Sequence, residues 1–161
     1  PDTIQAMENL AVTIHASGQL EETRELEQQV LKARMDTFGS SHPDTIEAMA
    51  NLAITLCLNG QLGEARELEQ QVLKARTEIF GSSHPYTIQA MENFAITLHS
   101  SGQPEETREL EQHVLKASRE AFGSSHPDTI EAMENLAATI HASGQPEGAG
   151  AANTESKNRS I

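Results

Sequence analysis

The sequence is poor in the residues that typify secreted, membrane-spanning and aromatic-rich globular proteins. It has a single cysteine, Cys57, so no disulfide can form within the chain, and a reducing, cytoplasmic compartment is expected. Trp is absent and aromatic residues make up 3% of the chain, so a core must be built from aliphatic side chains. No apolar run approaches the roughly 18 residues of a membrane helix, and we expect no signal peptide.

Basic residues are also scarce. The 161 residues include 11 Lys or Arg against 24 Asp or Glu, which gives a formal net charge of -13. A surface that binds nucleic acid needs clustered Lys and Arg to displace counterions from phosphates, and an anionic membrane attracts the same residues. We therefore expect neither nucleic acid nor a membrane as a partner.

The sequence contains a repeated phrase at a fixed interval. Pro43, Pro85 and Pro127 each follow a histidine and are followed closely by Thr-Ile, and the chain itself opens with Pro1-Asp-Thr-Ile. Successive prolines of this set are 42 residues apart, which is the signature of a repeat protein. The predicted units are 1–42, 43–84, 85–126 and a partial unit, 127–147. The remaining segment, 148–161, has no apolar stripe and is predicted to be disordered or frayed.

Each unit predicts two antiparallel helices and no strand. The apolar stripe of the first helix in the first unit consists of Ile4, Met7, Leu10, Ala11 and Ile14. After Gly18, a second stripe consists of Leu20, Thr23, Leu26, Val30 and Leu31. Helices of about 15 and 19 residues joined by short turns pack as antiparallel neighbours, and each pair buries its stripes only by stacking on the next pair. We therefore expect an all-α solenoid of about seven helices.

These residues resemble the tetratricopeptide repeat signature. The positions that carry the resemblance in the first unit are Asn9, Leu10, Ala11, Ile14, Gly18, Glu22, Val30 and Leu31. The 42-residue period, the His-Pro-Asp opening and the Phe-Gly closing resemble the kinesin light chain class of that family, over residues 1–147. The resemblance implies a right-handed superhelix whose first helices line a concave groove for a protein or peptide. One departure is Glu27, Glu69 and Glu111, which stand where the family prefers an aromatic residue.

The groove positions implied by this resemblance are the candidate binding site. The asparagines Asn9, Asn51, Asn93 and Asn135 recur at one position, where an amide could bond a peptide backbone whatever its sequence. Alternatively, each asparagine bonds the neighbouring unit and fixes the stack. The other candidates vary between units, as a recognition surface would, although neutral drift would vary any exposed face in the same way: Glu8, Val12, His15, Glu47, Ile54, Cys57, Leu58, Gln89, Glu92, Ile96, His99, Glu131, Glu134 and His141.

The charge of these positions indicates the kind of partner. The predicted groove holds Glu8, Glu47, Glu92, Glu131 and Glu134 but no Lys or Arg. We therefore expect a neutral or basic protein segment, and not the C-terminal carboxylate of a chaperone that some family members bind. Two alternatives stay open. Arrays could associate end to end, because a terminal helix lacks a neighbour, or the chain could be the sensor region of a larger signal-transduction NTPase, since similar arrays occur there.

No pattern of residues points to an enzyme or a cofactor. The sequence contains no G-x-x-x-x-G-K-[ST], G-x-G-x-x-G, H-E-x-x-H or C-x-x-C motif. The carboxylates are predicted to lie on solvated helix faces. His15, His99 and His141 share one groove position, but successive units hold them too far apart to converge on a metal. His42 and its equivalents are expected to cap helices. The sequence thus predicts a non-enzymatic scaffold or adaptor without metal or cofactor.

Overall fold

The computed structural model describes residues 2–144, which form seven α-helices and no strand. In chain order they are α1 (Asp2–Ala16), α2 (Leu20–Phe38), α3 (Pro43–Leu58), α4 (Leu62–Phe80), α5 (Pro85–Ser100), α6 (Pro104–Phe122) and α7 (Pro127–Gly144). The predicted all-α fold is confirmed, and so are the predicted helix lengths, since α1 has 15 residues and α2 has 19. The predicted tail, 148–161, lies outside the described residues.

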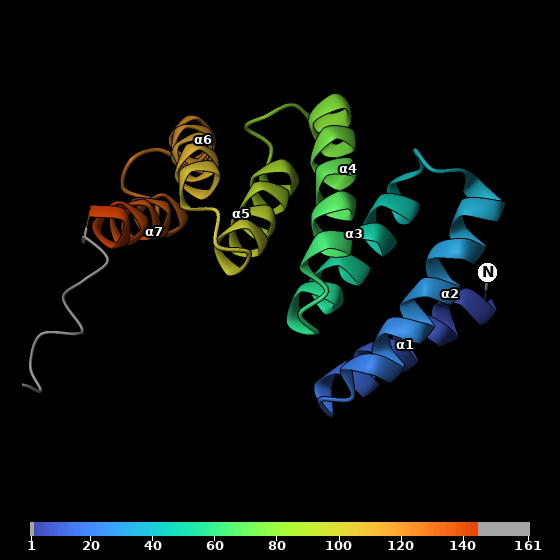
Figure 1. Cartoon of the computed structure of the whole chain (residues 1–161). Helices are drawn as coiled ribbons and strands as arrows, with labels where there is room; N and C mark the ends of the chain where they lie inside the picture. Colours follow the sequence, from blue (N-terminus) through green and yellow to red (C-terminus); the bar gives the residue numbers. More distant parts are fainter. Residues whose placement is uncertain (1, 145–161) are drawn as a thin grey trace, which may run out of the picture.

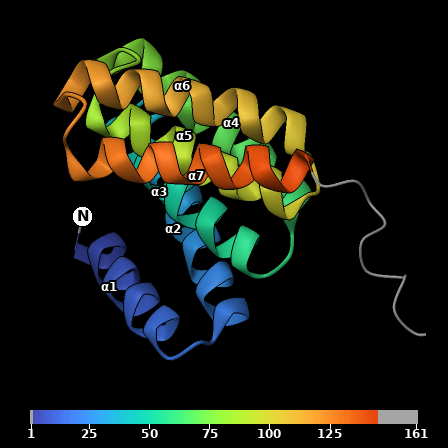
Figure 2. The same cartoon turned by 90° about the vertical axis from the view of Figure 1, so that its left-hand side faces the viewer.

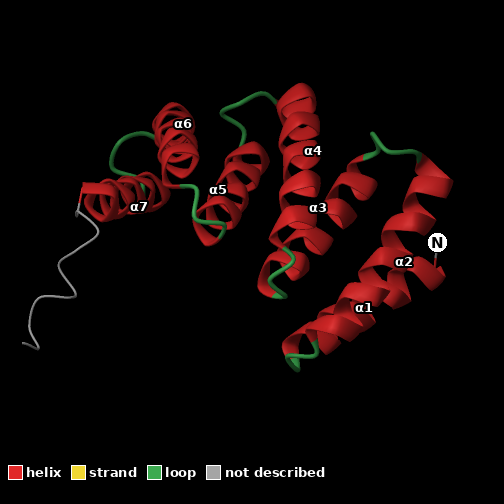
Figure 3. Ribbon diagram, viewed as in Figure 1, coloured by secondary structure: helices red, strands yellow, loops and turns green. Residues whose placement is uncertain are grey.

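The helices run back and forth in a curved array (Figure 1). Each helix packs against the next one along the chain, as Figure 2 shows for α6 and α7, and only short loops connect them (Figure 3). The backbones of α3 and α5 also approach each other closely, whereas within residues 2–144 the backbones of no two even-numbered helices do. The odd-numbered helices therefore form the inner layer of a curved solenoid, and the even-numbered helices form the outer layer.

A histidine directly precedes each of the last three units and caps the first helix of that unit. His42 Nδ1 accepts a hydrogen bond from the backbone N–H of Asp44 at 3.2 Å, and the following Pro43 suits the first helical turn because it needs no N–H partner. The imidazole ring also stacks on Phe38, with 4.6 Å between ring centroids. The same arrangement recurs at His84 and His126. The predicted capping role of these histidines is confirmed.

The core repeats from one unit to the next. Ile46 and Met49 of α3 are buried against Val72 of α4. In the following unit, their equivalents Ile88 and Met91 of α5 are buried in the same way against α6. Because neighbouring pairs share these contacts, the apolar stripes predicted from the helical spacing are buried by stacking, as expected for a repeat protein.

One position of the predicted stripe is wrong at the start of the array. Leu10 of α1 is 49% exposed, whereas Leu52 at the equivalent position of α3 is 4% exposed. Leu52 packs beside Leu31, which belongs to the preceding helix α2. In the described chain α1 has no preceding helix, so Leu10 lacks this neighbour.

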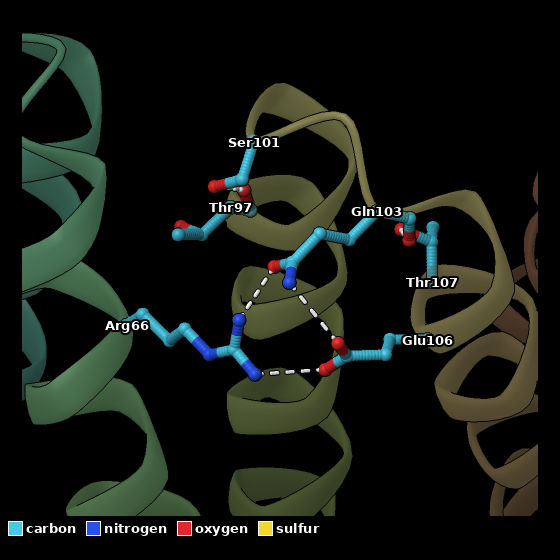
Figure 4. Close-up of polar contacts among 6 residues, drawn as sticks. All are labelled: Arg66, Thr97, Ser101, Gln103, Glu106 and Thr107. Atoms are coloured by element: carbon cyan, nitrogen blue, oxygen red, sulfur yellow. Dashed lines mark hydrogen bonds and ion pairs between the residues drawn. The ribbon is translucent and has the colours of Figure 1, made fainter.

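Polar contacts join the outer helices of successive units. Arg66 of α4 donates hydrogen bonds to Gln103 Oε1 at 2.6 Å and to Glu106 Oε2 at 2.8 Å (Figure 4). Gln103 Nε2 in turn donates to Glu106 Oε1 at 3.0 Å. These three side chains form a closed polar triangle at the start of α6, which links that helix to α4 without direct backbone contact.

Candidate binding groove

Two wide hollows on the inner layer of the array are lined by predicted site residues, and a smaller one of about 50 Å³ lies between α1 and α3 beside Glu8. The larger, of about 490 Å³, lies between α5 and α7 and has α6 at its floor. The second, of about 360 Å³, lies between α1 and α3 and has Glu27 of α2 at its floor. The predicted site residues that line the larger hollow are Glu92, Asn93, Ile96, His99, Glu131 and Asn135. Those that line the second are Val12, His15, Asn51 and Ile54. The structure therefore brings these predicted residues together in two places.

The asparagines differ from one another in their contacts. Asn9 accepts a hydrogen bond from Gln5 Nε2 at 3.4 Å, within its own helix. Asn93 and Asn135 lie on opposite walls of the larger hollow, and Asn51 lines the second. Within residues 2–144 the structure gives the side-chain amides of these three residues no hydrogen bond to a neighbouring unit. The alternative in which the asparagines fix the stack thus finds no support in these contacts.

The remaining predicted residues fall into two groups. Val12, Leu58 and Ile96 are among the most exposed large apolar side chains, and Ile96 is 59% exposed. Glu134 and His141 are also exposed, along α7. Cys57, in contrast, is half-buried and packs against the core cluster that contains Leu56. Its sequence position is equivalent to that of His15, but it contributes to the core more than to the groove.

Arginines of the outer helices reach the groove carboxylates, which corrects the prediction that no basic residue accompanies them. Arg34 of α2 forms an ion pair with Glu8 of α1 and donates a hydrogen bond to the carbonyl oxygen of Asp44 on α3. One arginine from the outer layer thus joins two adjacent inner helices. The prediction was wrong because it considered only side chains on the first helix of each unit.

Arg76 repeats this arrangement in the next unit. It is 4% exposed, and its Nη2 lies 2.8 Å from Glu47 Oε2. Its Nη1 donates to the carbonyl oxygen of Tyr86 at 2.9 Å and to Gln89 Oε1 at 3.3 Å. Glu47 lies on α3 and the other two acceptors lie on α5, so Arg76 again bridges two inner helices. A buried guanidinium with this many charge-assisted bonds holds its neighbours in a fixed register.

The prediction that all carboxylates are solvated is wrong for a second set of residues. Glu69 of α4 is 4% exposed, and its Oε1 accepts a hydrogen bond from Thr97 Oγ1 at 3.0 Å. Glu111 of α6 accepts the equivalent bond from Thr139 at 3.0 Å. The Oε2 atoms of Glu27, Glu69 and Glu111 have no hydrogen-bond partner among the described residues. Burial raises the pKa of Glu69 to about 7.

A sequence signal for these glutamates existed. They recur once in each unit at a position where the family prefers an aromatic residue. For Glu69 and Glu111, a threonine follows 28 residues later and supplies the hydrogen-bond donor. A polar residue that recurs where an apolar one is expected, always with a hydrogen-bonding residue at the same distance along the sequence, is typical of a buried polar pair.

The comparisons with known proteins agree with this geometry. A family model described as tetratricopeptide repeat (TPR) matches residues 2–78, 56–120 and 86–156. The chain belongs to the tetratricopeptide repeat family. Among solved structures, the TPR array is similar to a Podosopora anserina putative kinesin light chain with nearly identical TPR-like repeats, at 30% identity and a TM-score of 0.80. That match covers 91% of this chain and 69% of the other, and a point variant of the same protein gives a TM-score of 0.81.

A third similar structure extends the fold beyond close sequence relatives. BtubC (BKLC) from P. vanneervenii has a TM-score of 0.80 at 16% identity, over 88% of this TPR chain and 56% of that chain. At this identity the likeness shows the fold alone. A search of curated proteins finds no match.

Together these matches support a TPR solenoid of the kinesin light chain-like class. TPR solenoids serve in general as scaffolds for protein–protein interaction. No helix of residues 2–144 is both long and apolar enough to cross a membrane.

Proposed function

We propose that this TPR array binds a neutral or basic protein segment in the concave groove of its inner layer and performs no chemistry of its own. The observation that carries the proposal is the lining of the two hollows. Amides of Asn51 and Asn93 face these hollows without a hydrogen bond to another unit, beside the exposed apolar side chains of Ile54 and Ile96. Such a surface offers backbone hydrogen bonds and apolar contacts to an extended or helical segment.

Charge supports a neutral or basic partner. The chain has a net charge of -13, and Glu92 and Glu131 line the larger hollow. Groups of opposite charge across an interface favour association, whereas a carboxylate would be repelled here. The attraction should weaken with added salt, because screening at physiological ionic strength acts over about 8 Å. A cytoplasmic location, in which Cys57 stays reduced, belongs to the same proposal.

A peptide-library screen at low and high salt tests the proposal. We expect neutral or basic sequences to be selected, and the double variant Asn51→Ala/Asn93→Ala to lose them. The matched control is Gln28→Ala/Gln70→Ala, which removes two exposed amides from the outer helices α2 and α4 and should leave binding unchanged. Selection of acidic C-terminal peptides, or binding that ignores both asparagines, would contradict the proposal.

End-to-end self-association is a second candidate, which the exposed ends of this array favour. Leu10 at one end is 49% exposed, and Ile130 and Ile140 at the other are 43% and 48% exposed. Their equivalents inside the array are buried. Sedimentation analysis of the wild type and of Leu10→Glu/Ile140→Glu would show whether these faces join copies of the chain. The role as sensor region of a larger NTPase stays a prediction.

A further inference from the structure

The outer helices carry the same residue position in three successive units, but not the same residue. Arg34 of α2, Arg76 of α4 and Ser118 of α6 are separated by the 42-residue period. We use the term junction for an even-numbered helix together with the two inner helices that flank it. The first two junctions thus have an arginine at this position, and the third junction, α5–α6–α7, has a serine.

The third junction nevertheless contains glutamates equivalent to those of the first junction, where one of them pairs with the arginine. The inner-helix pair Glu8 and Glu47 of the first junction recurs as Glu92 and Glu131 of the third, again separated by two periods. In the first junction the guanidinium of Arg34 pairs with Glu8. In the third junction no ion pair between a described Lys or Arg and Glu92 or Glu131 is present.

Side chains near Ser118 do not replace the arginine. Ser118 is 0% exposed, and its Oγ has no hydrogen-bond partner among the described residues. The neighbouring Arg119 is exposed and directs its Nη2 to Met133 Sδ at 3.6 Å. A wholly buried hydroxyl without a partner is unusual, because its desolvation is not compensated.

The hollow between α5 and α7 differs from those between α1 and α3 more in the charges around it than in its size. Between α1 and α3, where Arg34 is present, a hollow of about 50 Å³ lies beside Glu8 and another of about 360 Å³ lies beside His15 and Ile54. In the third junction the hollow beside Glu92 and Glu131 has a volume of about 490 Å³ and no Lys or Arg among its described lining residues. Ser118 does not line this hollow, but the hollow has room for a partner's side chain beside carboxylates that no described Lys or Arg pairs with.

The larger hollow is also rich in acceptors. Glu111 faces it and has an unpartnered Oε2. Burial, together with the carboxylates of Glu131 and Asp128, raises the pKa of Glu92. His99 is the one other titratable group among the described residues that line this hollow. A cation placed among these carboxylates would relieve their mutual repulsion.

We propose that the hollow between α5 and α7 binds the guanidinium group of a partner's arginine side chain, in place of the arginine that the chain itself supplies at the first two junctions. The inference rests on the proposed function, because it specifies the basic group that the groove recognises. Arginine suits this site better than lysine, since its planar fork of five N–H donors can reach carboxylates on two helices and a carbonyl at once.

A peptide pair tests the inference with the intact chain. The probe is acetyl-Ala-Ala-Arg-Ala-Ala-amide, and its control carries citrulline, which keeps the shape of arginine without the charge. In an NMR titration of the ¹⁵N-labelled protein we expect saturable shifts confined to residues of α5, α6 and α7 around the hollow. The citrulline peptide should bind at least about tenfold more weakly, because charge-assisted hydrogen bonds are the stronger ones.

Substitutions at the arginine position make the test specific. Ser118→Arg should pair an arginine of the chain with Glu92, as Arg34 pairs with Glu8, and abolish the response to the peptide, whereas Ser118→Ala should keep it. Conversely, Arg34→Ser should create a second arginine-responsive site between α1 and α3, beside Glu8 and Glu47. If Ser118→Arg does not fold, Glu92→Gln/Glu131→Gln removes the charges of the acceptors at nearly constant shape and should also abolish the response.

The outcomes separate this inference from the proposed function. An arginine response that survives both Ser118→Arg and Glu92→Gln/Glu131→Gln, or that spreads evenly over the acidic surface, would overturn the inference. Library peptides that need Asn51 and Asn93 but ignore Ser118→Arg would overturn it while leaving the proposed function intact. Specific arginine binding without any groove-binding segment would support the inference and count against the proposed function.

Discussion

The buried carboxyl group of Glu69 should make the array less stable as pH rises. Glu69 is 4% exposed, it accepts one hydrogen bond from Thr97, and its other oxygen has no partner among the described residues. Burial raises its pKa from 4.5 to about 7. A carboxyl group whose pKa is raised on folding binds more protons in the folded state than in the unfolded state. Its contribution is therefore complete below about pH 4.5 and is lost as pH rises through about 7.

The magnitude follows from the two pKa values. Their separation corresponds to a loss of roughly 3 kcal/mol in the free energy of unfolding between about pH 4.5 and pH 8. Replacing Glu69 by Gln keeps an oxygen that can accept the bond from Thr97, but removes the ionisation. The variant should therefore lose less stability over this range, and its advantage over the wild type should be largest at about pH 8.

Urea unfolding followed by circular dichroism, at several pH values, measures this difference. The matched control is Glu67→Gln, which removes an exposed carboxylate from the same helix. We expect the difference in unfolding free energy between wild type and Glu69→Gln to grow with pH, and the difference for Glu67→Gln to stay nearly constant. A constant difference for Glu69→Gln, or a wild type that gains stability relative to it at high pH, would refute the reasoning.

Three further predictions concern the packing of the array. Leu52→Ala should cost roughly 2–4 kcal/mol because Leu52 is buried between three helices, whereas Glu64→Ala, at an exposed position of α4, should cost less than about 1 kcal/mol; urea melts of both variants check the order. A chain truncated after residue 125 should still fold but should melt at a lower midpoint than one truncated after residue 145, because stability is shared between neighbouring units; equal midpoints would contradict this. His42→Ala should cost about 0.5–2 kcal/mol, measured by thermal melting, because it removes the helix cap to Asp44, and His113→Ala, on the exposed face of α6, is the control.

The helices were predictable because repetition supplies several copies of each local signal. Pro43 and its equivalents mark helix starts, and Gly18, at φ 78°, takes the left-handed conformation expected at the end of a helix. The exposure of Leu10 could not be predicted in the same way. Its sequence context matches that of Leu52, and only the neighbour that stacks against it differs.

The sequence predicted the site residues that lie on the inner helices themselves. It did not predict the residues that reach the groove from the outer helices. Asn93 and Asn135 were assigned to the groove from their position within a helix, and they line the same hollow. Arg34 and Arg76 were missed because each lies on an outer helix and passes between two inner helices. Such contacts depend on how far apart the inner and outer helices lie. The periodicity of apolar residues within one helix gives no information about that distance.

The Phe–His stack at each boundary between units has a consequence for how arrays of this kind change over time. The ring centroids are 4.6 Å apart for Phe38 and His42, 4.6 Å for Phe80 and His84, and 4.8 Å for Phe122 and His126. Because each of these boundaries uses the same stack, a gene that gains or loses a whole unit by recombination recreates a matching boundary each time. A change in the number of units can thus alter the length of the groove while each boundary between units keeps the same Phe–His stack. Point substitutions can alter the chemistry of one unit independently.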